Sequence, residues 1–393
     1  RRRRRRFSSQ TGSDSPVPSQ KHPSDGTASC GATTTAATAT ASPTVKLYDL
    51  LPHGRLSYPR TWAFQQVLLH RRLRTRRTKQ QQQQQQTQQQ PEPPRGGDDD
   101  DDDDDDSDCV VVMEHSPVYT LGRGADENHL TFARPDPGAE HHRHRPDRSS
   151  SSSEAVSRKL SRRVRGPGTA RLSVDRTTQE RLDELLAVMS RDRAHDYDDD
   201  DEVRSTLEVV DRLTESVSPV LAPNGFPVYR VDRGGEVTYH GPSQLVVYPM
   251  LDLKRGERED DLHRYLRKIE DVVLLTLDHY GIDTASRDET HTGVWVDEPE
   301  PSGDAPSGGG SSKIAAVGVS STRWITTHGF ALNVDPDLSA FDTSVILPCG
   351  IEGRGVTSMG DVLRRRNRSV PTLSEVAKVV IRTMEDVFGV AIR

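Results

Sequence analysis

The chain is poor in the residues that build large cores. Only 32% of its 393 residues are hydrophobic and 5% are aromatic, and at such values much of a chain cannot bury enough apolar surface to fold. The apolar residues gather after Phe226, with smaller clusters at 45–73 and 109–130. We therefore predict one globular core interrupted by disordered insertions. No run approaches the roughly 18 apolar residues of a membrane helix, so we expect a soluble protein without a membrane partner.

Cysteine is also scarce. Cys30, Cys109 and Cys349 lie far apart, without the CxxC spacing of a zinc or redox site. This pattern suits a reducing compartment and argues against a disulfide framework. The formal net charge of -7 says little about partners, because it adds the basic run 1–6 to nine successive aspartates at 98–106.

Acidic residues are rare at the N-terminus. Residues 1–44 are rich in Arg, Ser, Thr and Ala, and their only acids are Asp14 and Asp25. That composition resembles an organellar transit peptide, and Arg5-Arg6-Phe7-Ser8-Ser9 looks like the end of a mitochondrial presequence. We expect a mitochondrial protein; the alternatives are a disordered basic tail with a plastid or cytoplasmic location.

Three further tracts look like insertions into a catalytic domain at 45–393. Residues 78–108 carry polyglutamine and polyaspartate, 134–203 mix His/Arg, polyserine and aspartates, and 299–312 are rich in Gly, Ser and Pro. Such tracts lack the apolar periodicity of a packed element. At 179–189, however, Leu182, Leu185, Leu186 and Met189 share a helical face, which predicts a lone helix in a loose insertion.

The remaining periodicity predicts a mixed α/β domain. Residues 260–280 carry an apolar stripe at helical spacing, and a capping box from Thr372 to Glu375 begins a last helix that Gly389 ends. Short Val-rich runs predict strands at 109–114, 244–249, 293–296, 314–319 and 330–334. We expect 293–296 to pair with 314–319, and the helices to cover one face of a mixed sheet.

Candidate chemistry begins with Leu347-Pro348-Cys349-Gly350-Ile351. Pro348 favours an extended Leu347, and Gly350 permits backbone angles closed to other residues. Cys349 is thus predicted to lie in a tight turn that presents its sulfur. The alternative is a small buried hydrophobe, a common fate of a lone cysteine.

The second candidate is the segment from Arg233 to Pro242, with the sequence RGGEVTYHGP. Its two adjacent glycines let a ligand approach the backbone closely, and Arg233 and His240 offer donors for a carbonyl, thioester or phosphate. We predict a polar binding loop between the strands 228–231 and 245–248. The alternative is an ordinary turn.

Two further candidates lie in strands. Lys313 enters the apolar run 314–319, where its ammonium needs water or a partner. His328 and Gly329 open the run 330–334. The alternatives are a lysine that reaches into solvent at a strand end and a hydrogen-bonded structural histidine.

In this order the four elements resemble the lipoyl(octanoyl) transferase family of the biotin/lipoate ligase superfamily. Flanking blocks at 112–123 and 356–359 strengthen the resemblance, which covers 46–73, 109–130 and 226–393 and is interrupted only by the insertions. One departure is Ser243, because the family commonly has Gly-Pro-Gly-Gln where this chain has Gly241-Pro242-Ser243-Gln244. We expect a small cost in backbone freedom there.

The resemblance implies a single biotin/lipoate protein ligase-like domain and an acyl transfer. The donor would be octanoyl-acyl carrier protein, and the acceptors would be lysines in the lipoyl domains of 2-oxoacid dehydrogenase complexes and in the glycine cleavage H protein. Cys349 would be the acyl-accepting nucleophile and Lys313 the partner that lowers its pKa, with no metal or nucleotide cofactor. The implied substrate contacts are Arg233, Gly234, Gly235, Glu236, Val237, Thr238, Tyr239, His240, Ala316, Val317, Gly318, Gly329, Phe330 and Ala331.

Two other classes of function stay open at this point. An ATP-dependent lipoate or biotin ligase needs no nucleophilic cysteine, so the intact Cys349 block favours transfer. A non-enzymatic interaction protein could bind nucleic acid nonspecifically through its basic tracts. The cluster His141-His142-Arg143-His144 could also bind metal, although an arginine-rich tract makes a poor cage.

Overall fold

The computed structural model describes residues 42–88, 107–126, 129–130, 170–192, 199–214, 218–255, 261–297, 311–347 and 354–393. Structural statements below refer to these residues. The N-terminal tract 1–41 with Cys30, the cluster His141–His144 and the tight turn predicted around Cys349 lie outside them.

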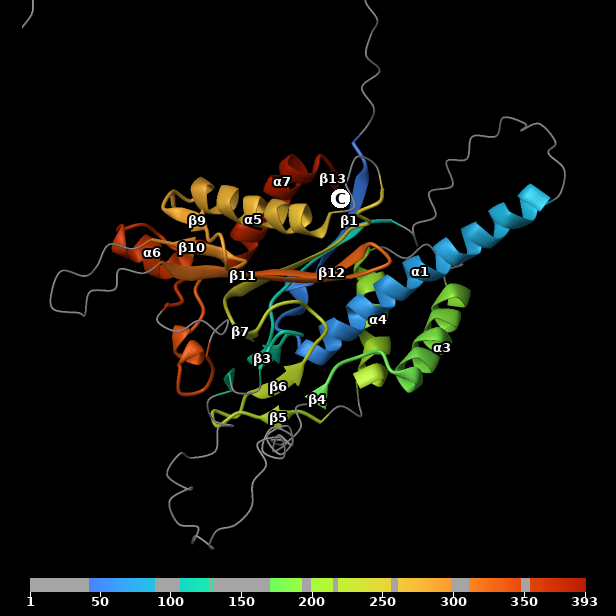
Figure 1. Cartoon of the computed structure of the whole chain (residues 1–393), viewed down its shortest axis with the longest axis horizontal. Helices are drawn as coiled ribbons and strands as arrows, with labels where there is room; N and C mark the ends of the chain where they lie inside the picture. The colour runs from blue at the N-terminus through green and yellow to red at the C-terminus, as the bar shows by residue number, and fades with distance from the viewer. Residues whose placement is uncertain are drawn as a thin grey trace, which may run out of the picture. The chain divides into compact units, whose positions relative to one another are not determined.

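A mixed eight-stranded sheet forms the centre of the fold (Figure 1), in the order β13-β1-β2-β8-β12-β11-β10-β9. Its strands are β1 (Thr44–Asp49), β2 (Cys109–Met113), β8 (Gln244–Met250), β9 (Ala285–Arg287), β10 (Val294–Val296), β11 (Ser312–Thr322), β12 (Ile325–Asn333) and β13 (Ala391–Ile392). β1 pairs in parallel with β13 and β2, and the other pairs are antiparallel. The predicted strands and the pairing of 293–296 with 314–319 are confirmed.

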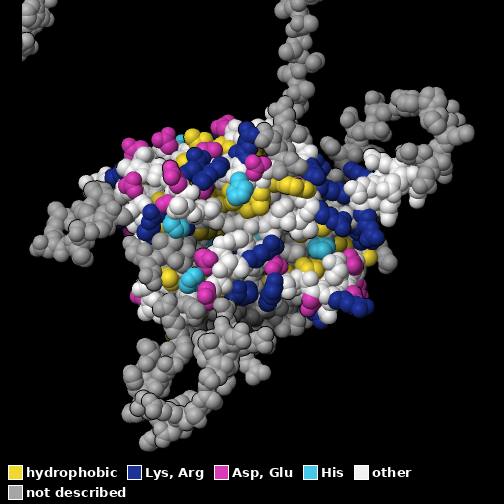
Figure 2. Space-filling model, in the orientation of Figure 1, with side chains coloured by type: hydrophobic (Ala, Val, Ile, Leu, Met, Phe, Trp, Pro, Cys, Tyr) yellow, Lys and Arg dark blue, Asp and Glu magenta, His cyan; other side chains and the backbone are white. Residues whose placement is uncertain are grey.

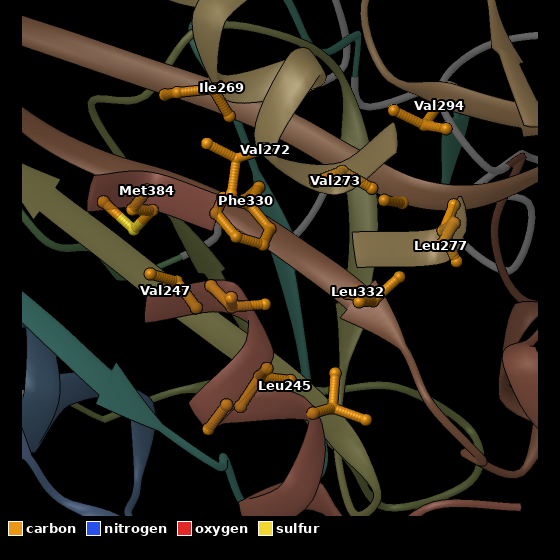
Figure 3. Close-up of a cluster of buried hydrophobic side chains, with 14 of the residues drawn as sticks. Leu245, Val247, Ile269, Val272, Val273, Leu277, Val294, Phe330, Leu332 and Met384 are labelled. Carbon is orange, nitrogen blue, oxygen red and sulfur yellow. The ribbon is translucent and has the colours of Figure 1, made fainter. Parts of the chain in front are cut away.

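One face of this sheet carries the predicted helices α5 (Leu262–His279) and α7 (Leu373–Phe388). Figure 3 shows Ile269, Val273 and Leu277 of α5 directed at the side chains of β8 and β12. The capping box of Thr372 and Glu375 is present, and Gly389 ends α7 in the left-handed conformation. Helix α6 (Met359–Arg365) adds Met359 and Leu363 to the same core.

The other face is also covered, so the prediction that helices lie on one face is wrong. Helix α1 (Tyr58–Gln88) packs there, on the opposite side of the sheet from α5 (Figure 1). In β2, Val110 and Val112 point to the α5 side, whereas Val111 and Met113 point to the α1 side. A continuous apolar strand of this kind is typical of a sheet buried on both faces.

The insertions contain more structure than their composition suggests. Helix α1 continues through Gln88, and the tract 134–203 includes β4 (Ala170–Arg171), α3 (Arg176–Asp192) and the start of α4 (Asp199–Thr214). The helix predicted at 179–189 is present but not isolated, because Leu182 and Leu186 are buried in the core under α1. Glu202 of α4 also pairs with Arg71 at 2.6 Å and with Lys46 at 3.0 Å. The packing of α3 and α4 thus corrects the prediction of a loose insertion.

A smaller five-stranded sheet lies beside the first. It contains β4, β6 (Pro227–Arg230), β3 (Val118–Leu121) and β7 (Val237–His240), and β5 (Val220–Leu221) pairs with β6. Residues 237–240, predicted as part of a loop, are therefore a strand, because they complete an antiparallel pair with β3. The 3-10 turns are η1 (Leu51–His53) and η6 (Leu338–Phe341).

Basic side chains are concentrated on the surface over α1, the helix on the face of the sheet opposite α5. Basic side chains gather on the right of the view in Figure 2, over α1, where Arg74, Arg77 and Lys79 are exposed. Among the described residues, no helix is both long enough and apolar enough to cross a membrane.

Candidate active site

A cavity of about 210 Å³ lies where the two sheets meet the turn before β10. Its lining includes most of the predicted substrate contacts, namely Arg233, Gly235, Glu236, Val237, Thr238, His240, Ala316, Val317, Gly318, Gly329, Phe330 and Ala331. Lys313 lines it too, so the structure brings together the three predicted motifs that it describes.

The β11–β12 pair forms one wall. Its register places Ala316 opposite Ala331, Val317 opposite Phe330, and Gly318 opposite Gly329. A Cβ atom at Gly329 would overlap the carbonyl oxygen of Val247 on the neighbouring strand, so only glycine fits there. Gly329 lies in the middle of β12 rather than at its start, which corrects the predicted strand boundary.

The Arg233 segment forms a second wall, and its arginine mainly holds that wall together. Arg233 is buried, and its guanidinium donates to the carbonyl oxygens of Thr120 at 2.9 Å, Gly234 at 3.0 Å and Glu236 at 3.0 Å. The N–H of Gly234 donates to Val319 O on β11 at 2.9 Å. The two walls are therefore joined through main-chain groups.

Two predicted contacts do not line the cavity. Gly234 faces Val319 of β11. Tyr239 points into the small sheet's own core against Tyr119, Phe226 and Phe341, with ring centroids 5.3 to 5.9 Å away. Side chains alternate along a strand, so Thr238 and His240 face the cavity side while Tyr239 faces the opposite side. The contiguous motif could not reveal this alternation before 237–240 was known to be a strand.

Lys313 is the second residue of β11, and its side chain is buried rather than solvated. Its Nζ donates to Thr292 O at 3.1 Å and lies 4.6 Å from the centroid of the Trp295 ring. The alternative of a lysine reaching into solvent is therefore wrong.

The segment that follows the Cys349 motif runs beside Lys313. The N–H of Lys313 donates to Gly355 O at 3.0 Å, and the N–H of Thr357 donates to Lys313 O at 3.0 Å. On the other side of the motif, the N–H of Leu347 donates to His129 O at 2.8 Å. The described residues on both sides of Cys349 are thus anchored, one side directly on Lys313.

Sequence reasoning missed the turn before β10. Thr290, His291 and Thr292 line the cavity, and Asp288 holds them by accepting from the N–H groups of Thr290 at 2.8 Å and His291 at 2.9 Å. The run of Thr, His and Thr just before the predicted strand at 293–296 was the signal available. Asp288 also pairs with Arg354. The Arg354 guanidinium and the turn's donors hold the pKa of the Asp288 carboxyl well below its usual range.

Tyr248, which was missed, and the candidate His328 complete the lining together with His240. Burial lowers the pKa of His328 to about 3, with Arg233 adding to the effect. Burial likewise sets the pKa of His240 well below its ordinary value and that of Tyr248 well above. Near neutral pH these three side chains are uncharged, which suits an acyl chain better than an anionic ligand.

His328 was alternatively interpreted as a hydrogen-bonded structural histidine, and this holds for its backbone but not for its ring Nδ1. Its N–H donates to Gln65 Oε1 at 2.9 Å, but its buried Nδ1 has no hydrogen-bond partner among the described residues. Its φ of 59° lies in the left-handed region, which is uncommon for a residue other than glycine.

A chain of amide side chains links the cavity wall to the segment after Cys349. His240 Nδ1 donates to Gln244 Oε1 at 2.8 Å, since a carbonyl oxygen can only accept. Gln244 Nε2 donates to Asn333 Oδ1 at 2.9 Å, and Asn333 Nδ2 donates to Thr357 O at 2.9 Å. These three hydrogen bonds connect the wall to that segment.

Ser243, the departure from the family pattern, has a φ of 62°. A side chain in this region meets the backbone, so the backbone cost expected at Ser243 remains a prediction that this conformation supports. Its N–H donates to Glu114 Oε1 at 2.7 Å, which helps to keep the residue in that conformation.

The described residues contain no group of three His, Cys, Asp or Glu side chains placed to hold a metal. What they offer instead is a cavity whose two histidines and tyrosine are uncharged near neutral pH, with Lys313 at its wall. Such a site can bind an acyl chain and supply a positive charge beside a nucleophile.

Comparison with known proteins agrees with this geometry. The family model of the lipoyl protein ligase A/B catalytic domain matches residues 212–385. An octanoyltransferase of Agrobacterium fabrum is 44% identical over 177 residues, which are 45% of this chain and 62% of that protein. An octanoyltransferase of Rhizobium johnstonii is 40% identical over 212 residues, which are 53% of this chain and 84% of that protein.

Among solved structures, the crystal structure of lipoate-protein ligase A bound with ATP covers 90% of this chain and 88% of its own, with 11% identity and a TM-score of 0.42. At this identity and TM-score the similarity supports no conclusion about function. The chain spans 62% of the length of the Agrobacterium fabrum relative and 62% of that from Christiangramia forsetii. On the long match to the Rhizobium johnstonii protein, this chain belongs to the lipoyl(octanoyl) transferase family.

Proposed function

We propose that this protein takes an octanoyl group from octanoyl-acyl carrier protein onto Cys349 and passes it to a lysine of a lipoyl domain. One observation carries the proposal: Lys313 lies at the wall of the cavity and is paired through its backbone with the segment that follows Cys349. The protein's relatives are octanoyltransferases, which supports octanoyl as the group transferred and transfer as the type of reaction.

The first half-reaction loads the enzyme. A proton passes from the Cys349 thiol to the Lys313 amine, and the resulting ammonium favours the thiolate. The thiolate attacks the carbonyl carbon of the donor thioester, and the carrier's sulfur leaves and takes the proton back from Lys313. Octanoyl-Cys349 and a neutral Lys313 remain.

The second half-reaction consumes the acceptor amine. The lysine nitrogen of the lipoyl domain attacks the octanoyl-Cys349 carbonyl, an amide forms, and Cys349 leaves as a thiolate. Neutral Lys313 accepts the proton lost by the nitrogen, which restores the ion pair. All atoms balance without ATP, metal or another cofactor.

The cavity supplies binding for the chain of the acyl group. Burial contributes about 0.8 kcal/mol per methylene, and Val317 and Ala331 offer apolar contact, whereas the Phe330 ring is buried in the core under α5 (Figure 3). The uncharged His240, His328 and Tyr248 avoid the cost of placing a charge beside the chain.

Intact mass spectrometry tests the proposal. Purified protein mixed with octanoyl-acyl carrier protein should gain one octanoyl group on Cys349 and lose it when a lipoyl domain is added, both without ATP. Cys349→Ala should abolish loading, whereas Cys109→Ala should retain it, because burial raises the pKa of the Cys109 thiol to about 12. Acylation of the lipoyl domain from free octanoate and ATP alone would instead indicate a ligase.

The mitochondrial location is also a proposal, supported by the Arg-, Ser- and Thr-rich composition of residues 1–44. A fluorescent protein fused behind these residues should enter mitochondria. The same fusion with its basic run 1–6 changed to Gln should stay outside. Plastid or cytoplasmic fluorescence of the first fusion would contradict the proposal.

A further inference from the structure

Glu270 is the charged member of the buried face of α5, with an exposed fraction of 0%. Its neighbours on that face, Ile269 and Val273, point into the apolar core (Figure 3). A buried carboxylate costs several kcal/mol unless it is paired and hydrogen-bonded. The partners of this carboxylate should therefore indicate what it does in the fold.

Its two oxygens have different partners. Oε2 accepts from Arg267 Nη1 at 2.8 Å and lies 3.2 Å from Arg287 Nε. Both arginines are partly exposed, so they reach the carboxylate from the surface. Oε1 faces the other way and accepts from the N–H of Gly293 at 2.9 Å.

That N–H belongs to the peptide group whose carbonyl is Thr292 O. The same carbonyl oxygen accepts from Lys313 Nζ at 3.1 Å. Glu270 and Lys313 thus bind the two ends of one planar peptide group. Hydrogen bonds in series polarise one another, and a negative charge at the N–H end makes the carbonyl oxygen a stronger acceptor for an ammonium.

We propose that Glu270 is the positioning residue of Lys313, holding its ammonium at the cavity wall through the Thr292–Gly293 peptide. This inference rests on the proposed function, because it assigns a task to the lysine that serves Cys349. Glu270 itself does not line the cavity.

Other charged groups also lie near Lys313. Asp288 and His291 belong to the turn before β10, Arg287 lies on β9, and Arg354 lies 4.7 Å from the centroid of the Trp295 ring that Lys313 also faces. Asp288 is engaged by Arg354 and by the turn's N–H groups. Glu270, in contrast, binds the very peptide that accepts from Lys313.

The test is the pH profile of Cys349 alkylation by iodoacetamide in the full chain, followed by peptide mass spectrometry. Glu270→Gln keeps an acceptor for Gly293 but loses the charge, so the midpoint should rise and the rate near neutral pH should fall roughly tenfold, as expected for a weakened charged hydrogen bond. Glu270→Asp keeps the charge near its arginines but withdraws it by one methylene. It should shift the profile in the same direction, even if Glu270→Gln folds poorly.

Asp108→Asn is the matched control, because it breaks a buried ion pair with Arg72 under α1, on the other face of the sheet. It should lower stability and leave the profile unchanged. In a Lys313→Ala background, Glu270→Gln should add no further shift, since residues that act through one another are not additive.

Several outcomes overturn the inference: unchanged profiles in both Glu270 variants, an equal shift in Asp108→Asn, additive shifts in the double variant, or no shift in Lys313→Ala. Alkylation needs no acyl donor. Failure of the wild type to take up octanoyl would therefore overturn the proposed function separately.

Discussion

The carboxylate of Asp288 pairs with the guanidinium of Arg354 and thereby ties the cavity's turn before β10 to the segment that follows Cys349. The two residues come from distant parts of the chain, and Arg354 also contacts the Trp295 ring that Lys313 faces. The pair connects the turn before β10 with the segment after Cys349, two parts of the site that the proposed transfer needs in a fixed arrangement.

Breaking this pair should slow transfer more than it weakens donor binding. Asp288→Asn keeps the turn's acceptor for Thr290 but loses the ion pair, so we expect kcat to fall on the order of tenfold through misplacement, with KM for the donor little changed. Steady-state kinetics with octanoyl-acyl carrier protein checks this. Arg364→Gln, which loses a more exposed pair with Asp335, is the control and should act like the wild type.

Substitutions of Lys313 should distinguish an electrostatic role of this residue from a proton-transfer role. Lys313→Ala should raise the pH midpoint of Cys349 alkylation and lower transfer near neutral pH. Lys313→Arg retains the positive charge but stays protonated, so it should preserve loading better than the step that consumes the amine. Single-turnover assays of each half-reaction measure the difference. Equal loss of both steps in Lys313→Arg would contradict the proton-acceptor role.

The helical layer of α1, α3 and α4 should be needed for stability. Leu182 is fully buried, so Leu182→Ala should cost about 2–5 kcal/mol of unfolding free energy, measurable by denaturant unfolding. Leu221→Ala, at an exposed position, should cost far less. Replacing 89–106 with a short Gly/Ser linker should be tolerated, because loop closure changes by about 0.6 kcal/mol per doubling of length.

The buried histidines should make the protein sensitive to mild acid. The folded-state pKa values of His115 and His328 are lowered by burial to about 4 and about 3, below the roughly 6.5 of an unfolded chain. As pH falls below that value, the unfolded state binds protons that the native state does not. Stability should then drop by up to about 1.4 kcal/mol per pH unit for each such histidine.

Thermal unfolding between pH 7 and pH 4 measures this loss. His328→Asn removes one titrating group and suits the left-handed backbone, so its melting temperature should fall less steeply with pH. His279→Asn, at an exposed position, should follow the wild type. Identical slopes in all three proteins would contradict the assignment.

Glycine should be preferred at position 243. Ser243→Gly removes a Cβ from a left-handed residue with φ 62°, and we expect about 1 kcal/mol of added stability. Ser205→Gly in the exposed part of α4 should instead destabilise by about 0.5–1 kcal/mol, because glycine weakens a helix interior. Denaturant midpoints of the two variants would show the opposite signs.

Local patterns were enough for the elements whose signals lie within a few neighbouring residues. The apolar stripe of α5 and the Thr372–Glu375 capping box predicted their helices, since both depend on contacts within a turn or two. The motifs around Arg233, Lys313 and Gly329 were equally readable, and residues of all three line one cavity.

Other features depend on packing between distant parts of the chain and could not be predicted from composition or local patterns. Polar and low-complexity flanks hid α4 and the packing of α3, whose few apolar residues are buried because α1 covers them. The pairing of Val237–His240 with β3 turned Tyr239 away from the cavity. Glu270 and the turn from Thr290 to Thr292 gained their relation to Lys313 only when α5, β10 and β11 came together. No pattern along the chain encodes such a relation, because the contacts that create it join residues far apart in sequence.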